Sequence, residues 1–180
     1  LVKIAFDAVR QCHEDVGRLI AEFDGAMTNG GMQRIGNQDA VTSGISRAAY
    51  APYWMASKLY RLYHDADTTN VVDGINIVFF SDDGELPEPR LIVGRINYNV
   101  PPQSNVGDIA QDWDLDAGYR IWCNALPQNL GTVMECNDAD NGRVVRICVV
   151  ARDLYSIQSI ENITLLLNQV RIQFEEQGNG

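Results

Sequence analysis

The sequence lacks the short signatures of the common catalytic and nucleotide-binding sites. It contains no GxxxxGKS/T, GxGxxG, GxSxG or HExxH segment, so P-loop, dinucleotide-binding, hydrolase and zinc-protease chemistry have no support. Histidine is scarce as well, because only His13 and His64 are present, and neither is spaced to serve a nucleophile. These absences weaken the case for an enzyme, but catalysis by carboxylates leaves no short motif, so the question stays open.

Long apolar runs are absent too. No stretch approaches the ~18–20 uninterrupted apolar residues of a membrane span, and Asp7, Glu14 and Asp15 interrupt the opening segment where a signal peptide would be apolar. The four cysteines show no CxxC spacing and stand among apolar neighbours, as free thiols do. We therefore expect a cytoplasmic protein with reduced cysteines and no membrane partner.

The charge balance is acidic, and the rest of the composition is that of a globular domain. Fourteen basic and 24 acidic side chains give a net charge of −10, which repels phosphate backbones, so nucleic acid is not an expected partner. A chain of 180 residues with 46% hydrophobic and 21% charged residues fits a single domain, 1–180, with one sizeable core.

Helical periodicity marks both ends of the chain. From Val2 to Phe23 the apolar residues step by three and four, with charged residues on the far side, which predicts an amphipathic helix. The same spacing returns between Ser156 and Gly178 and predicts a C-terminal helix. A second N-terminal helix is predicted over 51–67. Between the two N-terminal helices, residues 28–49 hold four glycines without periodicity, which predicts a long flexible loop.

The middle of the chain has the alternation and the turn residues of β-strands. In the segment 90–98, Ile92, Ile96 and Tyr98 share one face, while Arg95 and Asn97 share the other. Aspartate, glycine and proline before this segment predict a hairpin with the preceding strand. The predicted strands are 75–80, 90–98, 119–123, 131–136 and 143–151.

The two last strands allow a test of cysteine pairing. If Asn141 and Gly142 form the turn between them, Cys136 lies opposite Ile147 and Cys148 lies opposite Glu135. Cys136 and Cys148 then do not face each other, and this hairpin requires no disulfide.

The order of these elements predicts an α+β fold. We expect an antiparallel sheet of about five strands, with two N-terminal helices and a C-terminal helix packed on one side. This element order is similar to that of small sensory modules of the GAF and PAS kind. The likeness is an analogy of element order, and no residue motif carries it.

Carboxylates gather at two places. Asp112, Asp114 and Asp116 have the alternating spacing with which calcium loops present oxygen ligands, so they are the candidate metal ligands. Ala117 and Cys123 stand where an EF-hand would have glycine and a bidentate glutamate, so a solvated turn is the alternative. Asp82, Asp83 and Glu85 stand in a predicted hairpin loop, where turn chemistry alone explains them.

Arginines in predicted strands and amphipathic aromatic residues are the sequence's main indication of a ligand. An arginine buried among apolar residues needs a partner, which is either a carboxylate ligand or an acidic side chain of the protein. Aromatic residues of this kind fill cores, but they also line small-molecule pockets. The candidate ligand-binding residues are Arg95, Arg120, Tyr98, Trp122, Tyr53 and Trp54.

Three functions are compatible with the sequence. The first is a non-catalytic small-molecule-binding or sensory domain that forms a homodimer through its terminal helices. The second is an acidic interaction protein, of the inhibitor or immunity type, that covers a basic partner with its aspartates. The third is a carboxylate- or metal-dependent enzyme. No cofactor is indicated by the residues.

Overall fold

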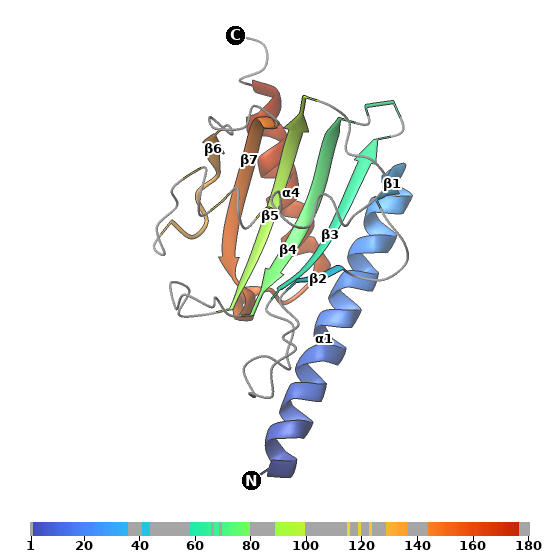
Figure 1. The fold of residues 1–180 in the computed structure, drawn as a ribbon, viewed down its shortest axis with the longest axis vertical. Coiled ribbons are helices and arrows are strands. Elements are labelled where there is room, and N and C mark those ends of the chain that lie inside the picture. Colours follow the sequence, from blue (N-terminus) through green and yellow to red (C-terminus); the bar gives the residue numbers. More distant parts are fainter. Residues whose placement is uncertain are drawn as a thin grey trace.

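The computed structural model describes a helix-covered antiparallel sheet (Figure 1). It describes residues 2–35, 41–43, 58–65, 67–68, 70–79, 89–99, 115, 119, 123, 129–136 and 144–176. The helices are α1 (Val2–Asn29) and α4 (Ile160–Glu176), with a short 3-10 turn η3 (Leu154–Ser156) before α4. The strands are β1 (Met32–Arg34), β2 (Val41–Ser43), β3 (Lys58–Asp65), β4 (Val71–Val78), β5 (Arg90–Tyr98), β6 (Met134–Cys136) and β7 (Val144–Asp153).

The strands form one antiparallel sheet, which confirms the predicted α+β class. Among the described residues the sheet has seven strands in the order β1-β3-β4-β5-β7-β6, and β2 also pairs with β3. The predicted hairpin is the β4–β5 pair, and β5 has the predicted bounds. The predicted strands 131–136 and 143–151 correspond to β6 and β7, whereas most of 119–123 lies outside the described residues.

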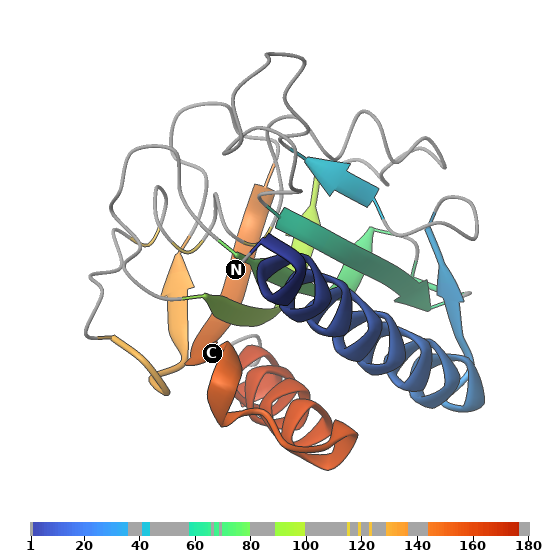
Figure 2. The same ribbon diagram turned by 90° about the horizontal axis from the view of Figure 1, so that it is seen from below.

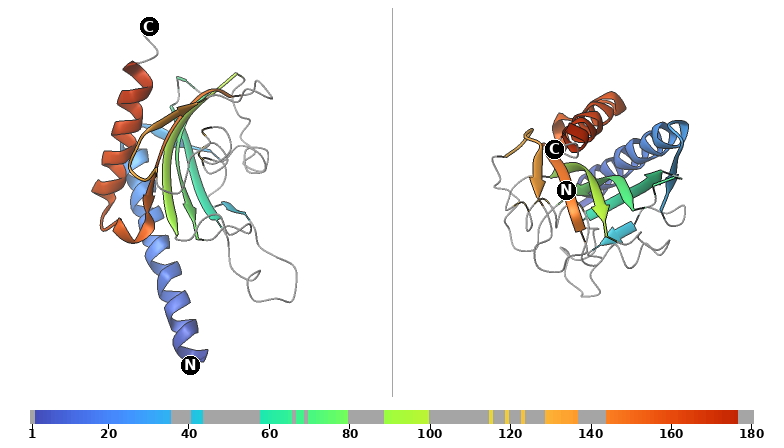
Figure 3. Two further views of the ribbon diagram at one scale, coloured as in Figure 1. Left: turned by 90° about the vertical axis from the view of Figure 1, so that its left-hand side faces the viewer. Right: turned by 90° about the horizontal axis from the view of Figure 1, so that it is seen from above.

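Both helices cover the same face of the sheet, as predicted for the terminal helices (Figures 2 and 3). Helix α1 contributes Val16, Ile20, Phe23 and Met27 to the core beneath them, and α4 contributes Ile163, Leu166, Leu167 and Val170. The opposite face carries a second apolar cluster that includes Ile92, Ile96 and Tyr98 together with Leu115 and Tyr119. The face assignment predicted for β5 is therefore confirmed.

The predicted second helix is wrong where the structure describes it. Residues 58–65 form β3, which lies inside the sheet between β4 on one side and β1 and β2 on the other. Leu59 to Tyr63 are buried without interruption, because the core beneath the helices covers one face and the second apolar cluster, with Leu115 and Tyr119, covers the other. A strand buried on both faces loses its apolar-polar alternation, and its run of Leu and Tyr then imitates a helical stripe.

The predicted long loop at 28–49 is also partly structured. Helix α1 continues to Asn29, and the segment supplies β1 and β2, which pair with opposite ends of β3. These strands are three residues long, too short to show a period of two in the sequence. Within this segment, residues 36–40 and 44–49 lie outside the described residues.

The cysteine prediction is half right. Glu135 pairs with Cys148 and Cys136 with Ile147, which is the predicted register. However, Cys136 forms a disulfide with Cys123, with the two Cα atoms 5.3 Å apart, so the expectation of four thiols is wrong. Cys12 and Cys148 are free. The pairing could not be read from the sequence, because Cys123 and Cys136 are 13 residues apart and no predicted strand pairing relates them.

Candidate functional site

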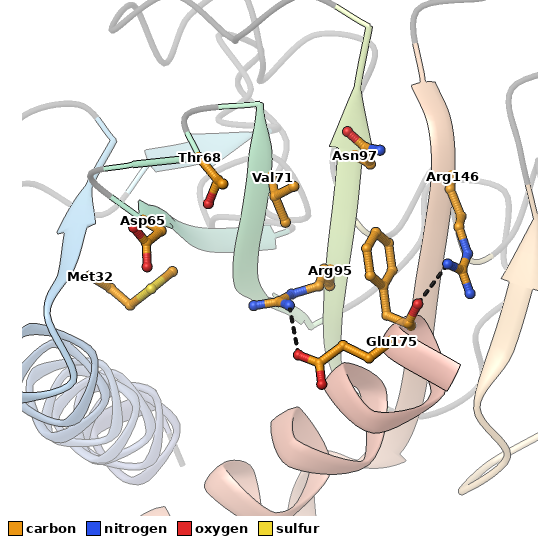
Figure 4. Close-up of a pocket in the computed structure, with 9 residues that line it drawn as sticks. Met32, Asp65, Thr68, Val71, Arg95, Asn97, Arg146 and Glu175 are labelled. Atoms are coloured by element: carbon orange, nitrogen blue, oxygen red, sulfur yellow. Dashed lines mark hydrogen bonds and ion pairs between the residues drawn. The ribbon is translucent and has the colours of Figure 1, made fainter. Parts of the chain in front are cut away.

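The helix-bearing face of the sheet contains an open groove of about 570 Å³, which we call the Arg95 groove (Figure 4). It crosses β3, β4, β5 and β7 at the end where both helices finish, since Met32 follows α1 and Phe174 belongs to the last turns of α4. Its lining combines charged, polar and apolar side chains: Met32, Asp65, Thr68, Val71, Arg95, Asn97, Arg146, Phe174 and Glu175.

Strand register explains why these residues meet. Val71 of β4 pairs with Asn97 of β5, and Asn97 pairs in turn with Arg146 of β7, so the three form one row across the sheet. Side chains directly opposite on neighbouring antiparallel strands point to the same face. Arg95 lies two residues from Asn97 on the same face, and Met32 of β1 pairs with Asp65 of β3. Six of the nine lining residues therefore belong to the paired strands of the sheet.

The buried carboxylate of Asp73 holds Arg95 in position. Asp73 stands directly opposite Arg95 on β4, has no exposed surface, and accepts hydrogen bonds from Arg95 Nε (2.6 Å) and Nη2 (2.9 Å). Asp73 Oδ2 also accepts from Nε (3.0 Å) and Nη2 (2.6 Å) of Arg171 on α4. One carboxylate thus joins β5 to α4 and holds two guanidinium groups.

The third nitrogen of Arg95 faces a weaker partner. Arg95 Nη1 lies 3.9 Å from Oε1 of Glu175, whose side chain is 72% exposed. This distance is beyond a hydrogen bond, and an exposed pair of this kind contributes little free energy. Arg95 therefore has one firmly bonded edge and one edge at the groove that a stronger acceptor can engage.

Burial and charge act in opposite directions on Arg95. Burial by itself lowers the pKa of its guanidinium, but the hydrogen bonds and the charge of Asp73 outweigh it, with smaller contributions from Glu175 and Asp65. The resulting pKa is above the usual value for arginine. The groove therefore contains a cation that persists across the whole physiological pH range.

Arg146 is the second cation of the lining. Its Nη1 donates to the Phe174 carbonyl (2.6 Å) and its Nη2 to the Gln173 carbonyl (3.3 Å), so it caps the C-terminal turn of α4. Its Nε donates to Oε1 of Glu135 on β6 (2.6 Å). The Phe174 ring lies against both arginines, with ring-centre distances of 4.5 Å to Arg146 and 5.6 Å to Arg95. These contacts hold the two guanidinium groups in place.

The predicted ligand-binding residues do not form one site. Arg95 lines the groove, whereas Tyr98 is buried on the opposite face of β5. Asp73 supplies the acidic side chain that was one of the two partners expected for a buried arginine. The other predicted residues, Arg120, Trp122, Tyr53 and Trp54, lie outside the described residues.

The predicted metal ligands Asp112, Asp114 and Asp116 lie outside the described residues. The second group of carboxylates, Asp82, Asp83 and Glu85, lies outside them as well. Within the described part of the chain, no group of three histidine, cysteine, aspartate or glutamate side chains is arranged to hold a metal ion.

Sequence reasoning missed most of the groove. Arg146 and Phe174 were not singled out, and neither were Asp65, Asp73 and Glu175. The Asp73–Arg95 pair could have been found, because the hairpin register of β4 and β5 places them opposite each other. Arg171 could not, since it reaches Asp73 from 98 residues further along the chain.

Comparison with known proteins finds no match among family models, curated proteins or solved structures. Neither α1 nor α4, the long helices of the described residues, combines the length and apolar character needed to cross a bilayer. The functional argument therefore rests on the groove and its chemistry.

Proposed function

We propose that this chain is a non-catalytic small-molecule-binding domain of the sensory or regulatory kind, with its ligand in the Arg95 groove. The observation that carries the proposal is the set of contacts that the Arg95 guanidinium group makes. Asp73 fixes two of its nitrogens, while Nη1 faces the exposed carboxylate of Glu175 at 3.9 Å, beyond hydrogen-bond distance. A positioned guanidinium group with one nitrogen turned to a groove is an arrangement that captures a carboxylate or phosphate group.

The size and lining of the groove support small-molecule binding. Its volume of about 570 Å³ falls within the range of ligand pockets, roughly 300–1,000 Å³. Phe174, Val71 and Met32 supply apolar surface, and Asn97 and Thr68 supply polar groups near it. The described lining residues include no cysteine, serine or histidine, so they do not form a Ser–His or Cys–His pair for nucleophilic catalysis.

The position of α4 supports a regulatory role. Phe174 and Glu175 belong to the last turn of this helix, and Arg146 caps the same turn through the carbonyls of Gln173 and Phe174. A ligand that displaces Glu175 from Arg95 changes the contacts of this turn directly. We expect the amide hydrogen exchange of residues 172–176 to respond to binding, as in a sensor whose output is a helix terminus.

Pairing of two copies through the terminal helices is part of the same proposal. Val16 is the first buried residue among the described side chains of α1, and Ile4 on the preceding turns is 72% exposed. Those turns extend past the sheet (Figure 3). Light scattering coupled to size-exclusion chromatography tests the pairing. A wild-type dimer that Ile4→Glu converts to a monomer supports it. A wild-type protein that is monomeric at about 100 μM, a concentration far above the dissociation constant expected for a functional dimer, overturns it.

A cytoplasmic location belongs to the proposal too, and the disulfide is the finding that bears on it. Disulfides persist mainly in oxidising compartments, so the Cys123–Cys136 bond opposes the expectation drawn from the sequence. Thiol trapping in rapidly acid-quenched cells tests it directly. Reduced Cys123 and Cys136 agree with the cytoplasm, whereas a fully oxidised pair points to another compartment.

The test of the binding function uses a blocked groove. The side chain of Thr68 is exposed and lines the groove, so Thr68→Trp places a large ring there. Saturation-transfer NMR against a library of carboxylates, phosphates, amino acids and amines is run on the wild type and on this variant. Gln158→Trp, in a separate open groove beside α1, is the matched control. We expect saturable binding to wild type and the control, and its loss in Thr68→Trp. Absence of any ligand, or unchanged binding to Thr68→Trp, overturns the proposal.

A further inference from the structure

We infer that the ligand of the Arg95 groove is a zwitterion of the amino-acid class, whose carboxylate binds Arg95 and whose ammonium group binds Asp65. This inference rests on the proposed function and names its ligand. It comes from the distribution of charge over the groove, from the C-terminal end of α1 beside it, and from the 3.9 Å separation between Arg95 Nη1 and Glu175.

The charge of the groove selects against a ligand that is only an anion. The lining has two cations, Arg95 and Arg146, and two anions, Asp65 and Glu175. The charged groups bonded to these two arginines are Asp73 and Glu135, and Asp73 is also bonded to Arg171. Three positive and four negative charges leave a net charge of −1, so a free carboxylate or phosphate would deepen an excess of negative charge. A ligand that also carries an ammonium group avoids this cost.

Asp65 is placed to receive the ammonium group. It is the last residue of β3, it is exposed, and it lies across the groove from Arg146 with Arg95 between them (Figure 4). Its negative charge is the smallest of the contributions that raise the pKa of Arg95. Its Oδ1 accepts the backbone N–H of Asp67 (2.8 Å), which orients the carboxylate group.

The C-terminal end of α1 strengthens the preference for a cation on the Asp65 side of the groove, because Met32, just after this helix, pairs with Asp65. Helix α1 ends at Asn29, three residues before Met32 of the lining, and α4 ends at Glu176, directly after Glu175. The carbonyl end of a helix carries a partial negative charge that favours a nearby cation. Arg146 already satisfies carbonyls of α4, whereas no basic residue occupies the last turn of α1.

The carboxylate of the ligand takes the place of Glu175 at Arg95. Glu175 Oε1 is 3.9 Å from Nη1, about 1 Å longer than a charge-assisted hydrogen bond. A ligand carboxylate at normal bonding distance therefore replaces a weak internal contact with a strong one. Asp73 keeps Nε and Nη2 in position during the exchange, so binding requires little rearrangement of Arg95.

The experiment uses sets of matched probes. The twenty proteinogenic L-amino acids are titrated by calorimetry, and each one that binds is compared with the same molecule lacking its amino group and with the amine lacking its carboxylate. We expect both truncated probes to bind at least about tenfold more weakly, the loss of one charge-assisted hydrogen bond.

Two variants assign the charged groups. Asp65→Asn should weaken the amino acid and the amine about tenfold, and it should not weaken the carboxylic acid. Glu175→Gln should tighten the amino acid and the carboxylic acid, because it removes the internal competitor for Nη1. Asp15→Asn, an exposed aspartate of α1, is the matched control and should change none of these affinities.

The outcomes separate this inference from the proposed function. If carboxylic acids or phosphates bind as tightly as amino acids, and Asp65→Asn has no effect, the zwitterion is wrong and binding at the groove stands. Binding of amines alone also overturns the zwitterion. If neither these probes nor the library described above binds the wild-type protein, the proposed function falls with the inference.

Discussion

Asp73 and Arg95 stand directly opposite each other on β4 and β5, and their side chains are joined by two hydrogen bonds of 2.6 and 2.9 Å. Asp73 has no exposed surface and also receives two bonds from Arg171 of α4. The same pair therefore fixes a helix to the sheet and positions the cation of the proposed binding groove.

Removal of the Asp73 charge should be strongly destabilising. In Asp73→Asn, two partly buried guanidinium groups lose their shared counterion, and we expect the free energy of unfolding to fall by about 3–5 kcal/mol. Urea denaturation followed by circular dichroism measures the change. Glu175→Gln removes the exposed partner of the same arginine and should leave stability unchanged. Equal effects from the two variants would contradict the structural role of Asp73.

Two glycines should respond to alanine in opposite directions. A Cβ added at Gly94 would lie 2.6 Å from Leu115 and 2.7 Å from Val149, so Gly94→Ala should cost about 1–3 kcal/mol by overpacking. A Cβ at Gly17 of α1 meets nothing within 4 Å, so Gly17→Ala should gain about 0.5–1 kcal/mol of helix stability. Thermal unfolding of both variants gives the signs. A tolerated Gly94→Ala would contradict the close approach of Leu115 to β5.

Alkaline pH should destabilise the protein through Cys148. Burial, followed by the charge of Glu135, raises the pKa of this thiol from 9.0 to about 11. Because the folded pKa is above the unfolded one, the folded state holds the proton more tightly. The resulting stability is complete below about pH 9 and is lost as the pH rises towards 11.

The thiol titration can be observed directly. In Cys12→Ser the other two cysteines form the disulfide, so Cys148 is the sole thiol. Its thiolate absorbance should appear with a midpoint near 11 in the folded protein and near 9 after denaturation in urea. A midpoint near 9 in both states would show that the thiol is accessible, against its complete burial in β7.

The disulfide should contribute measurably to stability. Cys123 and Cys136 are 13 residues apart, and closure of a loop of this length is worth about 3 kcal/mol in the chain-entropy account. The double variant Cys123→Ala, Cys136→Ala should lose about this amount in non-reducing urea titrations. Cys12→Ser, at the exposed free cysteine of α1, should unfold like the wild type.

How far the sequence anticipated the fold depended on how each element is buried. Strand β5 was predicted with its bounds and its two faces, because Arg95 and Asn97 break its apolar run at regular positions. The register of β6 and β7 followed from a two-residue turn, and the structure confirms it. In contrast, β3 is buried on both faces and was mistaken for a helix, since no polar alternation remains to mark it.

The candidate site was harder to predict than the fold. Arg95 was singled out because an arginine in an apolar strand needs a partner, and the opposite strand supplied Asp73. The rest of the groove combines Asp65 of β3, Arg146 of β7 and Glu175 of α4, which only the sheet order and the position of the helix bring together. None of these contacts leaves a local pattern in the sequence.

The central claim is that the Arg95 groove is a ligand site, and one measurement tests it most directly. Protein labelled with ¹⁵N is titrated with the tightest-binding amino acid, and the backbone amides and the Arg95 Nε–H are followed by NMR. We predict saturable shifts at Arg95, Asn97 and residues 173–176, with none around Leu19 in the groove beside α1. Saturation with no change at Arg95, or shifts centred on Leu19, would contradict the account.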